Sequence, residues 1–235
     1  MFNGSTVVLT GVGGEGQVGE IVARALADRG ASLVLVDRQA AKAEARAGAL
    51  VDAGRPARGY ACDLASPDAV ERLVAAVRRE HDDNIRALVH MAGGFAMSGP
   101  VADSSIEVWN RQIAINLTTA YLTARAFLPM LRVAGGSLVF FASQAALPAT
   151  TGADMAAYAV AKTGVAVLAR AIAAEERKHG VRSNALAPAA IRTAANLTSM
   201  GAGARFVERE DVAAAVVFLC SDASRAINGQ VIALA

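Results

Sequence analysis

The chain has 235 residues, enough for one large α/β domain with a substantial core. Its formal net charge is +2 and its basic residues are scattered, so it lacks the concentrated basic face of a nucleic-acid-binding protein, and no nucleic-acid partner is expected. The two cysteines, Cys62 and Cys220, have neither metal-ligand spacing nor a disulfide framework. We therefore expect buried thiols in a reducing compartment and no metal site.

No targeting segment or membrane partner is expected. The first basic residue is Arg24, so the positively charged beginning of a signal peptide is missing. The longest uncharged run, residues 133–153, is interrupted by glycines, a glutamine and a proline, which does not fit a membrane helix. We expect a cytoplasmic protein.

In the first half of the chain, apolar strand-like runs alternate with helix-like runs. We expect strands at residues 5–10, 32–36, 57–61 and 86–91. Helices are expected at 18–29 and 39–53, ended by Gly30 and Gly54, and at 66–80, where Ser66 caps the helix and Pro67 occupies its first turn.

The alternation continues to the end of the chain. One or two helices are expected at residues 104–131, a long apolar helix at 154–178, and a last helix at 208–221. The remaining strands are expected at 137–141, 181–186 and 230–234. This β-α-β pattern predicts one Rossmann-type domain over residues 1–235: a three-layer α/β/α sandwich with a mostly parallel, seven-stranded sheet.

A glycine-rich stretch separates the first strand from the first helix. Glycines at a strand-to-helix turn let the backbone approach a pyrophosphate, and the helix N-terminus then favours its negative charge. The alternative is a merely flexible loop. The five glycines of this turn are Gly11, Gly13, Gly14, Gly16 and Gly19.

An acidic residue follows the second strand, about 20 residues beyond the glycines. Asp37 can accept hydrogen bonds from an adenosine ribose 2′-hydroxyl and would repel a 2′-phosphate, which favours NAD over NADP. Arg38 follows directly and would partly offset that repulsion. The alternative is that Asp37 is a turn residue. Asp63 and Leu64, after the third strand, can reach the adenine.

The long apolar helix contains a tyrosine and a lysine four residues apart, Tyr158 and Lys162. That spacing puts both side chains on one helix face, where a cation lowers the pKa of a phenol from its ordinary value of about 10. A tyrosine so tuned can exchange a proton near neutral pH. The alternative is an ordinary helical pair. Ser143 lies upstream, just past the fifth strand, where open α/β sheets place their ligands.

Taken together, these motifs make the sequence similar to the short-chain dehydrogenase/reductase family over nearly its whole length. Within the family, the segment after Thr193 and the turn from Ala92 to Phe95 resemble a dihydropteridine-reductase-like or unassigned bacterial branch. The motifs occur in the family's order: the glycine turn, Asp37, Asp63-Leu64, Ala92-Gly93, Asn116, Ser143, Tyr158-x-x-x-Lys162 and residues 184–193.

The resemblance implies a mechanism. Tyr158 would donate a proton to the carbonyl oxygen in reduction, or remove one from the alcohol in oxidation. Lys162 would lower the pKa of Tyr158 and hold the nicotinamide ribose, and Ser143 would hydrogen-bond the substrate oxygen. Asn116 would hold a water that relays protons to Lys162. The hydride chemistry belongs to the nicotinamide, which the protein orients.

The resemblance also implies the cofactor contacts, with Ile191 and Thr193 at the nicotinamide carboxamide. The full set is Gly11, Gly13, Gly14, Gly16, Gln17, Val18, Gly19, Asp37, Arg38, Asp63, Leu64, Ala92, Gly93, Tyr158, Lys162, Pro188, Ile191 and Thr193.

Four features depart from the family pattern. The glycine turn is about two residues longer, with Gln17 where a glycine aligns, so it must follow a different path. Met91 replaces the asparagine of the usual Asn-Ala-Gly turn and removes a polar tie between neighbouring strands. Ala189 replaces the glycine after Pro188, and the segment between Ser143 and Tyr158 is slightly longer than usual.

We expect an NAD(P)-dependent oxidoreductase acting on a secondary alcohol or ketone. The alternatives are a nucleotide-binding protein with little or no catalysis, such as a sensor or scaffold, and a structural protein that uses the fold only for packing. His90 is interpreted as a packed strand residue. An apolar or aromatic substrate is expected against Phe95, Met97, Leu147 and Met155.

The family also usually pairs through its long helices, so a homodimer or homotetramer is expected. Ala166, Ala169 and Ala173 would permit close packing of such helices; alternatively, they face the chain's own sheet. The segment 194–205 is expected to be a short lid over a relatively open pocket.

Overall fold

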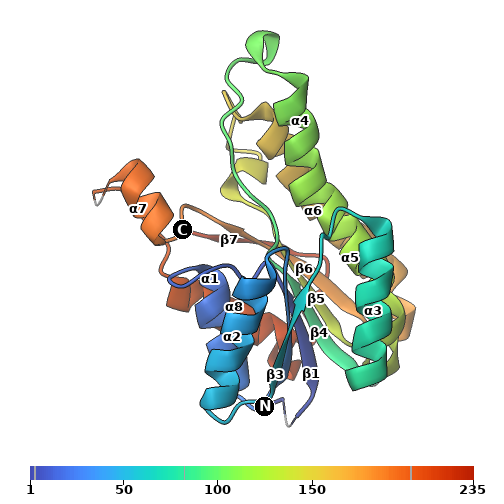
Figure 1. Cartoon of the computed structure of the whole chain (residues 1–235). Helices are drawn as coiled ribbons and strands as arrows, with labels where there is room; N and C mark the ends of the chain where they lie inside the picture. Colours follow the sequence, from blue (N-terminus) through green and yellow to red (C-terminus); the bar gives the residue numbers. More distant parts are fainter. Residues whose placement is uncertain (3, 82, 202) are drawn as a thin grey trace.

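A computed structural model describes residues 1–235 except Asn3, Asp82 and Ala202, and in this part of the chain seven strands form one sheet (Figure 1). The strand order is β3-β2-β1-β4-β5-β6-β7, and every neighbouring pair is parallel. The order reverses between β1 and β4, which makes a topological switch point at the carboxyl edge of the sheet. The strands are β1 (Thr6–Thr10), β2 (Ser32–Asp37), β3 (Ala57–Ala61), β4 (Ile85–His90), β5 (Ser137–Phe141), β6 (Arg182–Pro188) and β7 (Val231–Leu234).

Alternate residues of the strands enter two separate cores. Val8, Leu88 and Leu138 pack with α3 (Pro67–His81), α5 (Thr119–Ala134) and α6 (Ala156–Glu175). Leu9 and Val89 point the other way and pack with α1 (Val18–Ala27), α2 (Ala40–Asp52) and α8 (Arg209–Cys220). Side chains of successive strand residues point to opposite faces, so this division produces the predicted α/β/α sandwich.

The segment between β4 and β5 contains several helical pieces. After η1 (Val101–Asp103), α4 (Ile106–Gln112) begins at Ser105, whose hydroxyl accepts a hydrogen bond from the Val108 amide. A π-helical turn, η2 (Ile113–Thr118), joins α4 to α5. The expected helix at 104–131 is therefore interrupted by a wider turn, a feature that often marks functional sites. Helices α4 and α6 project beyond the sheet in Figure 1.

Helix α7 (Ala194–Met200) occupies much of the segment that is expected to form a short lid after β6. The Thr193 hydroxyl caps it by accepting a hydrogen bond from the Asn196 amide at 3.3 Å, and Gly201 follows its last residue. Ala202, in the same predicted segment, lies outside the described residues. The remaining short helices are η3 (Gln144–Ala146), η4 (Arg177–His179) and η5 (Asp222–Ser224).

Helix α6 belongs to the core of the chain. Among the described helices it alone is long and apolar enough, by length and composition, to cross a membrane. However, Val165, Ala166, Ala169 and Ile172 are buried in the core that includes strand residues of the sheet, and Ala173 is also buried. The alanine face predicted for contact with a second copy is therefore used inside the chain, because the small side chains let α6 approach its own sheet.

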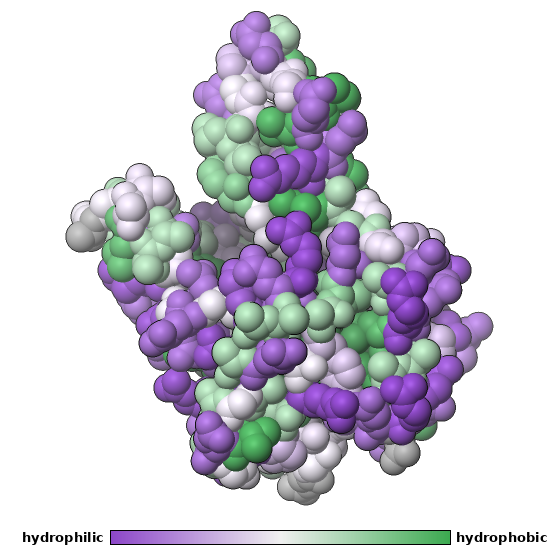
Figure 2. Space-filling model, viewed as in Figure 1, coloured by the Kyte–Doolittle hydropathy of each residue, from purple (hydrophilic) through white to green (hydrophobic). Residues whose placement is uncertain are grey.

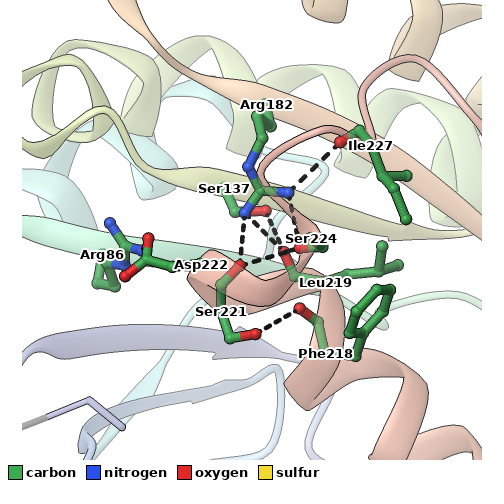
Figure 3. A network of polar contacts seen from close by, with 9 residues as sticks. All are labelled: Arg86, Ser137, Arg182, Phe218, Leu219, Ser221, Asp222, Ser224 and Ile227. Carbon is green, nitrogen blue, oxygen red and sulfur yellow. Dashed lines mark hydrogen bonds and ion pairs between the residues drawn. The ribbon is translucent and has the colours of Figure 1, made fainter.

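The amino edge of the sheet holds the end of α8 through an arginine at the start of β6 (Figure 3). The Arg182 guanidinium donates to the carbonyl oxygens of Leu219 and Ser221 at 3.0 and 3.2 Å and to the Ser224 hydroxyl at 3.0 Å. The Ser137 hydroxyl adds a 2.8 Å bond to the Leu219 carbonyl oxygen. Buried helix ends need such partners, so Arg182 stabilises the packing of α8 on the sheet.

Candidate active site

Two cavities adjoin at the carboxyl edge of the sheet. Their volumes are about 530 and 520 Å³. Five residues line both cavities, so the two form one continuous cleft: Met91, Gly93, Gly94, Phe141 and Ile191. The first cavity lies at the switch point between β1 and β4. The second lies between α6 and α7, where Figure 2 shows a hollow beside the projecting helices.

The first cavity requires glycine at two positions of the turn after β1. A Cβ on Gly11 would lie 2.5 Å from the Ala92 Cα, and a Cβ on Gly19 would lie 2.2 Å from the Val12 carbonyl oxygen. Backbone can therefore approach backbone here only because neither residue has a side chain. Gly13, Gln17 and Val18 line the cavity with them, which places the start of α1 against the space for a diphosphate.

Gly14 and Gly16 are not among the residues that line this cavity. The Gly14 carbonyl oxygen accepts a 3.0 Å hydrogen bond from Arg46. The Gly16 amide donates to Glu20 at 2.7 Å, and its carbonyl oxygen accepts from Arg209 at 2.8 Å. The backbone at Gly14 and Gly16 is thus bonded to side chains of α1, α2 and α8.

Asp37 lines the first cavity and also organises it. Its carboxylate accepts hydrogen bonds from the Gly13 and Gln39 amides, both at 3.0 Å. These bonds hold the acidic group beside the glycine turn. Arg38 lines the same cavity, as does Lys42, which sequence analysis missed. Lys42 follows Arg38 by four residues, and this spacing could have indicated that both cations border the same cavity.

Asp63 and Leu64, which are expected to reach the adenine, line the first cavity. The Asp63 carboxylate accepts a 3.0 Å bond from the Ala65 amide, which fixes the turn after β3. Ala92 lines this cavity, and Gly93 lines both cavities. Arg111 from α4, which sequence analysis also missed, lines this cavity together with the cations Arg38 and Lys42.

Ser143, Tyr158 and Lys162 all line the second cavity. The ring of Phe95 packs edge-on against Tyr158, with centroids 5.0 Å apart. The Lys162 ammonium donates to the Phe141 carbonyl oxygen at 2.8 Å and lies 5.8 Å from the centre of the Tyr158 ring. The structure thus brings the tyrosine, the lysine and the serine to one wall of the cleft.

The ionisation of the tyrosine differs from the expectation. Burial raises the pKa of Tyr158 above its ordinary value, and a hydrogen bond with Ser143 opposes that rise. Burial also lowers the pKa of Lys162 to about 8. The predicted lowering of the phenol's pKa is not met, because desolvation of the phenol has the largest effect on its pKa.

Asn116 lies beside the cleft without lining either cavity. It is 1% exposed, and its side-chain amide donates to the carbonyl oxygens of Gly94 at 2.9 Å and Gln112 at 3.0 Å. Its Oδ1 accepts from the Gly94 amide at 3.1 Å. A Cβ on Gly93 would lie 2.5 Å from that Oδ1 and 3.3 Å from the Lys162 ammonium. The Asn116 side chain therefore holds the turn after β4 in place through both backbone groups of Gly94.

The residues after β6 divide between the two cavities and the protein interior. Pro188 lines the second cavity and Ile191 lines both. Thr193 lines neither, since it is buried and caps α7. Sequence analysis did not predict α7, although Thr193 as an N-cap and Gly201 at the C-terminal end could have indicated a helix. One face of this helix borders the second cavity. This face supplies three lining residues: Asn196, Ser199 and Met200.

Two of the four expected apolar pocket residues line the second cavity. Phe95 and Met155 do so. Met97 is largely exposed, and Leu147 packs against the core below. Residues with neutral polar side chains, including Gln144 and Thr150, complete the wall, so the cavity is less uniformly apolar than expected.

Comparison with known proteins agrees with this arrangement. A family profile described as enoyl-(acyl carrier protein) reductase matches residues 11–234. The chain is 35% identical to D-threitol dehydrogenase of Mycolicibacterium smegmatis, covering 97% of this chain and 90% of that protein. It is 32% identical to cis-4-hydroxycyclohexanecarboxylate dehydrogenase of Sinomonas cyclohexanicum, covering 92% and 90%.

The fold is shared with solved structures as well. A short-chain type dehydrogenase/reductase from Mycobacterium ulcerans superposes with a TM-score of 0.89 at 32% identity, covering 98% of this chain and 88% of that one. Sequence and fold therefore agree over almost the whole chain. This protein belongs to the short-chain dehydrogenase/reductase family.

Proposed function

We propose that this chain interconverts a secondary alcohol and a ketone by hydride transfer with NAD(P), and that Tyr158 is its general acid/base. One observation carries the proposal: a glycine-lined cavity at the switch point joins a second cavity that contains Ser143, Tyr158 and Lys162. The relatives named as dehydrogenases of D-threitol and cis-4-hydroxycyclohexanecarboxylate support an enzyme over a non-catalytic nucleotide-binding protein.

The glycine turn fits a nicotinamide dinucleotide, which supplies the hydride chemistry when bound. Gly11 and Gly19 leave space that a Cβ would fill, and Gln17 and Val18 lie at the start of α1. Ala92, Gly93 and Ile191 would hold the cofactor between the cavities, while Asp63 and Leu64 would bind its adenine. Gly14, Gly16 and Thr193 lie outside both linings and are omitted from this proposed set.

Three residues of the second cavity and the neighbouring Asn116 have defined roles in the proposal. Tyr158 would exchange a proton with the substrate oxygen, and Ser143 would donate a hydrogen bond to the same oxygen. Burial raises the pKa of Tyr158 and so favours its protonated form, which suits proton donation in ketone reduction. Lys162 would bind the ribose near Gly93, and Asn116 would hold the Gly94 backbone in place.

We propose NAD as the preferred cofactor. The Asp37 carboxylate, fixed by the Gly13 and Gln39 amides, would accept hydrogen bonds from a ribose hydroxyl and repel a 2′-phosphate. Arg38 and Lys42 oppose that repulsion, so the discrimination should be modest. The substrate should be neutral, because Lys162 is the one charged side chain among the described residues that line the second cavity.

We also propose that residues 1–235 are a single cytoplasmic domain that forms a homodimer or homotetramer. One continuous sheet separates both cores, which supports a single domain. Hydrophobic residues gather on the projecting part of the molecule in Figure 2. Exposed apolar side chains on the helices there support pairing between copies: Ile106, Trp109, Tyr121, Val160 and Val167. Light scattering after size-exclusion chromatography tests this state.

Titration of the protein with NADH and NADPH, followed by intrinsic cofactor fluorescence, tests the cofactor proposal. The alcohols named for the two relatives begin the substrate panel, with oxidised cofactor and absorbance at 340 nm. Tyr158→Phe should lose at least about 100-fold in kcat while NADH affinity stays within about twofold. If Tyr158→Phe retains full activity, the acid/base assignment is wrong. If neither cofactor binds, the oxidoreductase proposal fails.

A further inference from the structure

His90 is a buried histidine that the proposed chemistry does not use. It is the last residue of β4 and 2% exposed, and the next residue, Met91, lines the cofactor cavity. Its Nδ1 lies 2.9 Å from the Thr10 hydroxyl at the end of β1, and its Nε2 lies 3.3 Å from the Thr119 hydroxyl at the start of α5. The ring packs against Phe140 at a centroid distance of 6.2 Å. His90 thus connects two strands and the helix that follows the π-helical turn.

The partners determine which ring nitrogen carries the proton. The Thr119 hydroxyl donates to the Ile115 carbonyl oxygen at 2.8 Å, and a carbonyl oxygen only accepts. The single proton of Thr119 is therefore used there, so its oxygen accepts from Nε2–H of His90. Nδ1 must then be the acceptor, and the Thr10 hydroxyl donates to it. Burial and the positive charge of Lys162 lower the pKa of His90 to about 3, which agrees with a neutral ring.

This chain of hydrogen bonds ends in the π-helical turn that carries Asn116. Ile115 precedes Asn116, and Ile115 and Thr119 both line the cofactor cavity. A second tie joins Gly94 to Asn116 through both the amide and the carbonyl group of Gly94. The turn between His90 and Gly94 is thus held to the same helical segment at both of its ends.

Gly93 lies between these two sets of hydrogen bonds. Because Gly93 has no Cβ, Asn116 and Lys162 can both lie close to it. A shift of the π-helical turn would therefore change the position of the Asn116 side chain relative to Gly93 and Lys162. Met91, by contrast, offers no polar atom comparable to an amide at the position where the family has an asparagine. The link between β4 and β1 is made by the preceding residue, His90, through Thr10.

We propose that His90, as its neutral Nε2–H tautomer, is a positioning residue that fixes the π-helical turn and, through it, Asn116 and Lys162. The proposal rests on the proposed function for its effect on catalysis, whereas the tautomer and the bond to Thr119 are properties of the protein alone. His90 acts through Thr119 and Ile115 and has no role of its own in proton transfer to substrate.

The tautomer is tested on the unaltered protein by long-range ¹H–¹⁵N correlation spectroscopy of the imidazole rings at pH 7. The sequence has three histidines, and loss of one set of signals in His90→Asn assigns His90. We expect the pattern of a neutral ring protonated at Nε2. A charged ring, or a neutral ring protonated at Nδ1, would overturn the proposal regardless of any activity.

Three substitutions separate the two hydrogen bonds of the ring. In His90→Asn, the side-chain oxygen can still accept from Thr10, but the amide is too short to reach Thr119. In His90→Gln, the longer amide can still donate to Thr119. Thr119→Val removes the same bond from the other side. The matched control is Thr123→Val, one turn further along α5, because the buried Thr123 hydroxyl has no partner among the described residues.

We expect His90→Asn and Thr119→Val to lower kcat about tenfold on the best substrate of the panel, equivalent to about 1.4 kcal/mol, with KM changed less than threefold. His90→Gln should recover most of that loss, and Thr123→Val should match the parent. The double variant His90→Asn/Thr119→Val should be no slower than Thr119→Val, because one bond is removed twice.

NADH affinity and melting temperature are measured for every variant. If His90→Asn keeps kcat within twofold of the parent, or if the two losses multiply in the double variant, the proposal is refuted. If His90→Gln and His90→Asn lose kcat equally in proportion to their melting temperatures, the role is structural and the proposal also fails. If the unaltered protein binds no NADH, the proposed function fails, while the spectroscopic test of His90 still applies.

Discussion

Gly93 is the position where a single added carbon should disturb the site most. A Cβ there would lie 2.5 Å from Asn116 Oδ1 and 3.3 Å from the Lys162 ammonium, whereas ordinary contacts begin at 3.4 Å. In Gly93→Ala, Asn116 and its π-helical turn must therefore move by roughly 1 Å. Neither neighbour can turn away freely, because Asn116 is bonded to Gly94 and Gln112, and Lys162 is bonded to the Phe141 carbonyl oxygen.

The expected magnitude follows from that displacement. Misplacing a catalytic arrangement by about 1 Å can cost about 100-fold in rate, which corresponds to about 2.7 kcal/mol in the activation barrier. Overpacking of this kind also lowers folding stability by about 1–3 kcal/mol, and in a chain of this size each kcal/mol lowers Tm by about 2–4 °C. Gly93→Ala should therefore reduce kcat/KM about 100-fold and melt about 2–12 °C lower than the parent.

The assay compares kcat/KM, NADH affinity and thermal unfolding in three proteins: the parent, Gly93→Ala and Gly48→Ala. Gly48 lies within α2, and a Cβ there meets nothing within 4 Å. Gly48→Ala should retain full activity and gain up to about 1 kcal/mol of stability from its better helix propensity. If Gly93→Ala keeps kcat/KM within threefold of the parent, the close approach of Asn116 and Lys162 does not control the site, and the reasoning is refuted.

Three further outcomes are expected. Arg182→Met removes the arginine donor from the carbonyl groups at the end of α8 and should lower the free energy of unfolding in urea by about 2–4 kcal/mol. Arg86→Ala, which breaks an ion pair with the exposed Asp222, should lower it by less than about 1 kcal/mol. Gly11→Ala should abolish NADH binding and Gly14→Ala should leave it within about threefold; equal losses would contradict the observed path of the turn. Since burial raises the pKa of Tyr158, alcohol oxidation at saturating substrate should still rise with pH at the ordinary phenol pKa of about 10. A profile that levels off below that pH would contradict the raised pKa.

Sequence reasoning predicted the layers because their causes are local. The buried strands are short runs of apolar residues, and helix starts such as Ser66 with Pro67 are set by neighbouring residues; the Ser66 hydroxyl does accept from the Ala69 amide at 3.3 Å. The helix that joins Tyr158 to Lys162 is likewise local, since their spacing alone puts both side chains on one face. These predictions needed no knowledge of distant parts of the chain.

Errors arose where a distant segment decides the outcome. Ala169 looked suitable for contact with another copy, but its own sheet occupies that face of α6. The path of the glycine turn is a second case, because Arg209 of α8 donates to the Gly16 carbonyl oxygen, a contact that the sequence does not indicate. In both cases only tertiary packing selected the outcome.

The pKa of Tyr158 shows most clearly why local spacing is insufficient. A lysine four residues away favours phenolate only if its charge acts on the phenol more strongly than desolvation acts against it. Here the Phe141 carbonyl oxygen, from the end of β5, holds the ammonium at 2.8 Å, and burial of the ring has the larger effect. The proton affinity of the tyrosine therefore depends on the groups that bury its ring and on Ser143, just past the end of β5, so Ser143→Ala should raise the pKa of Tyr158 further without touching either member of the pair.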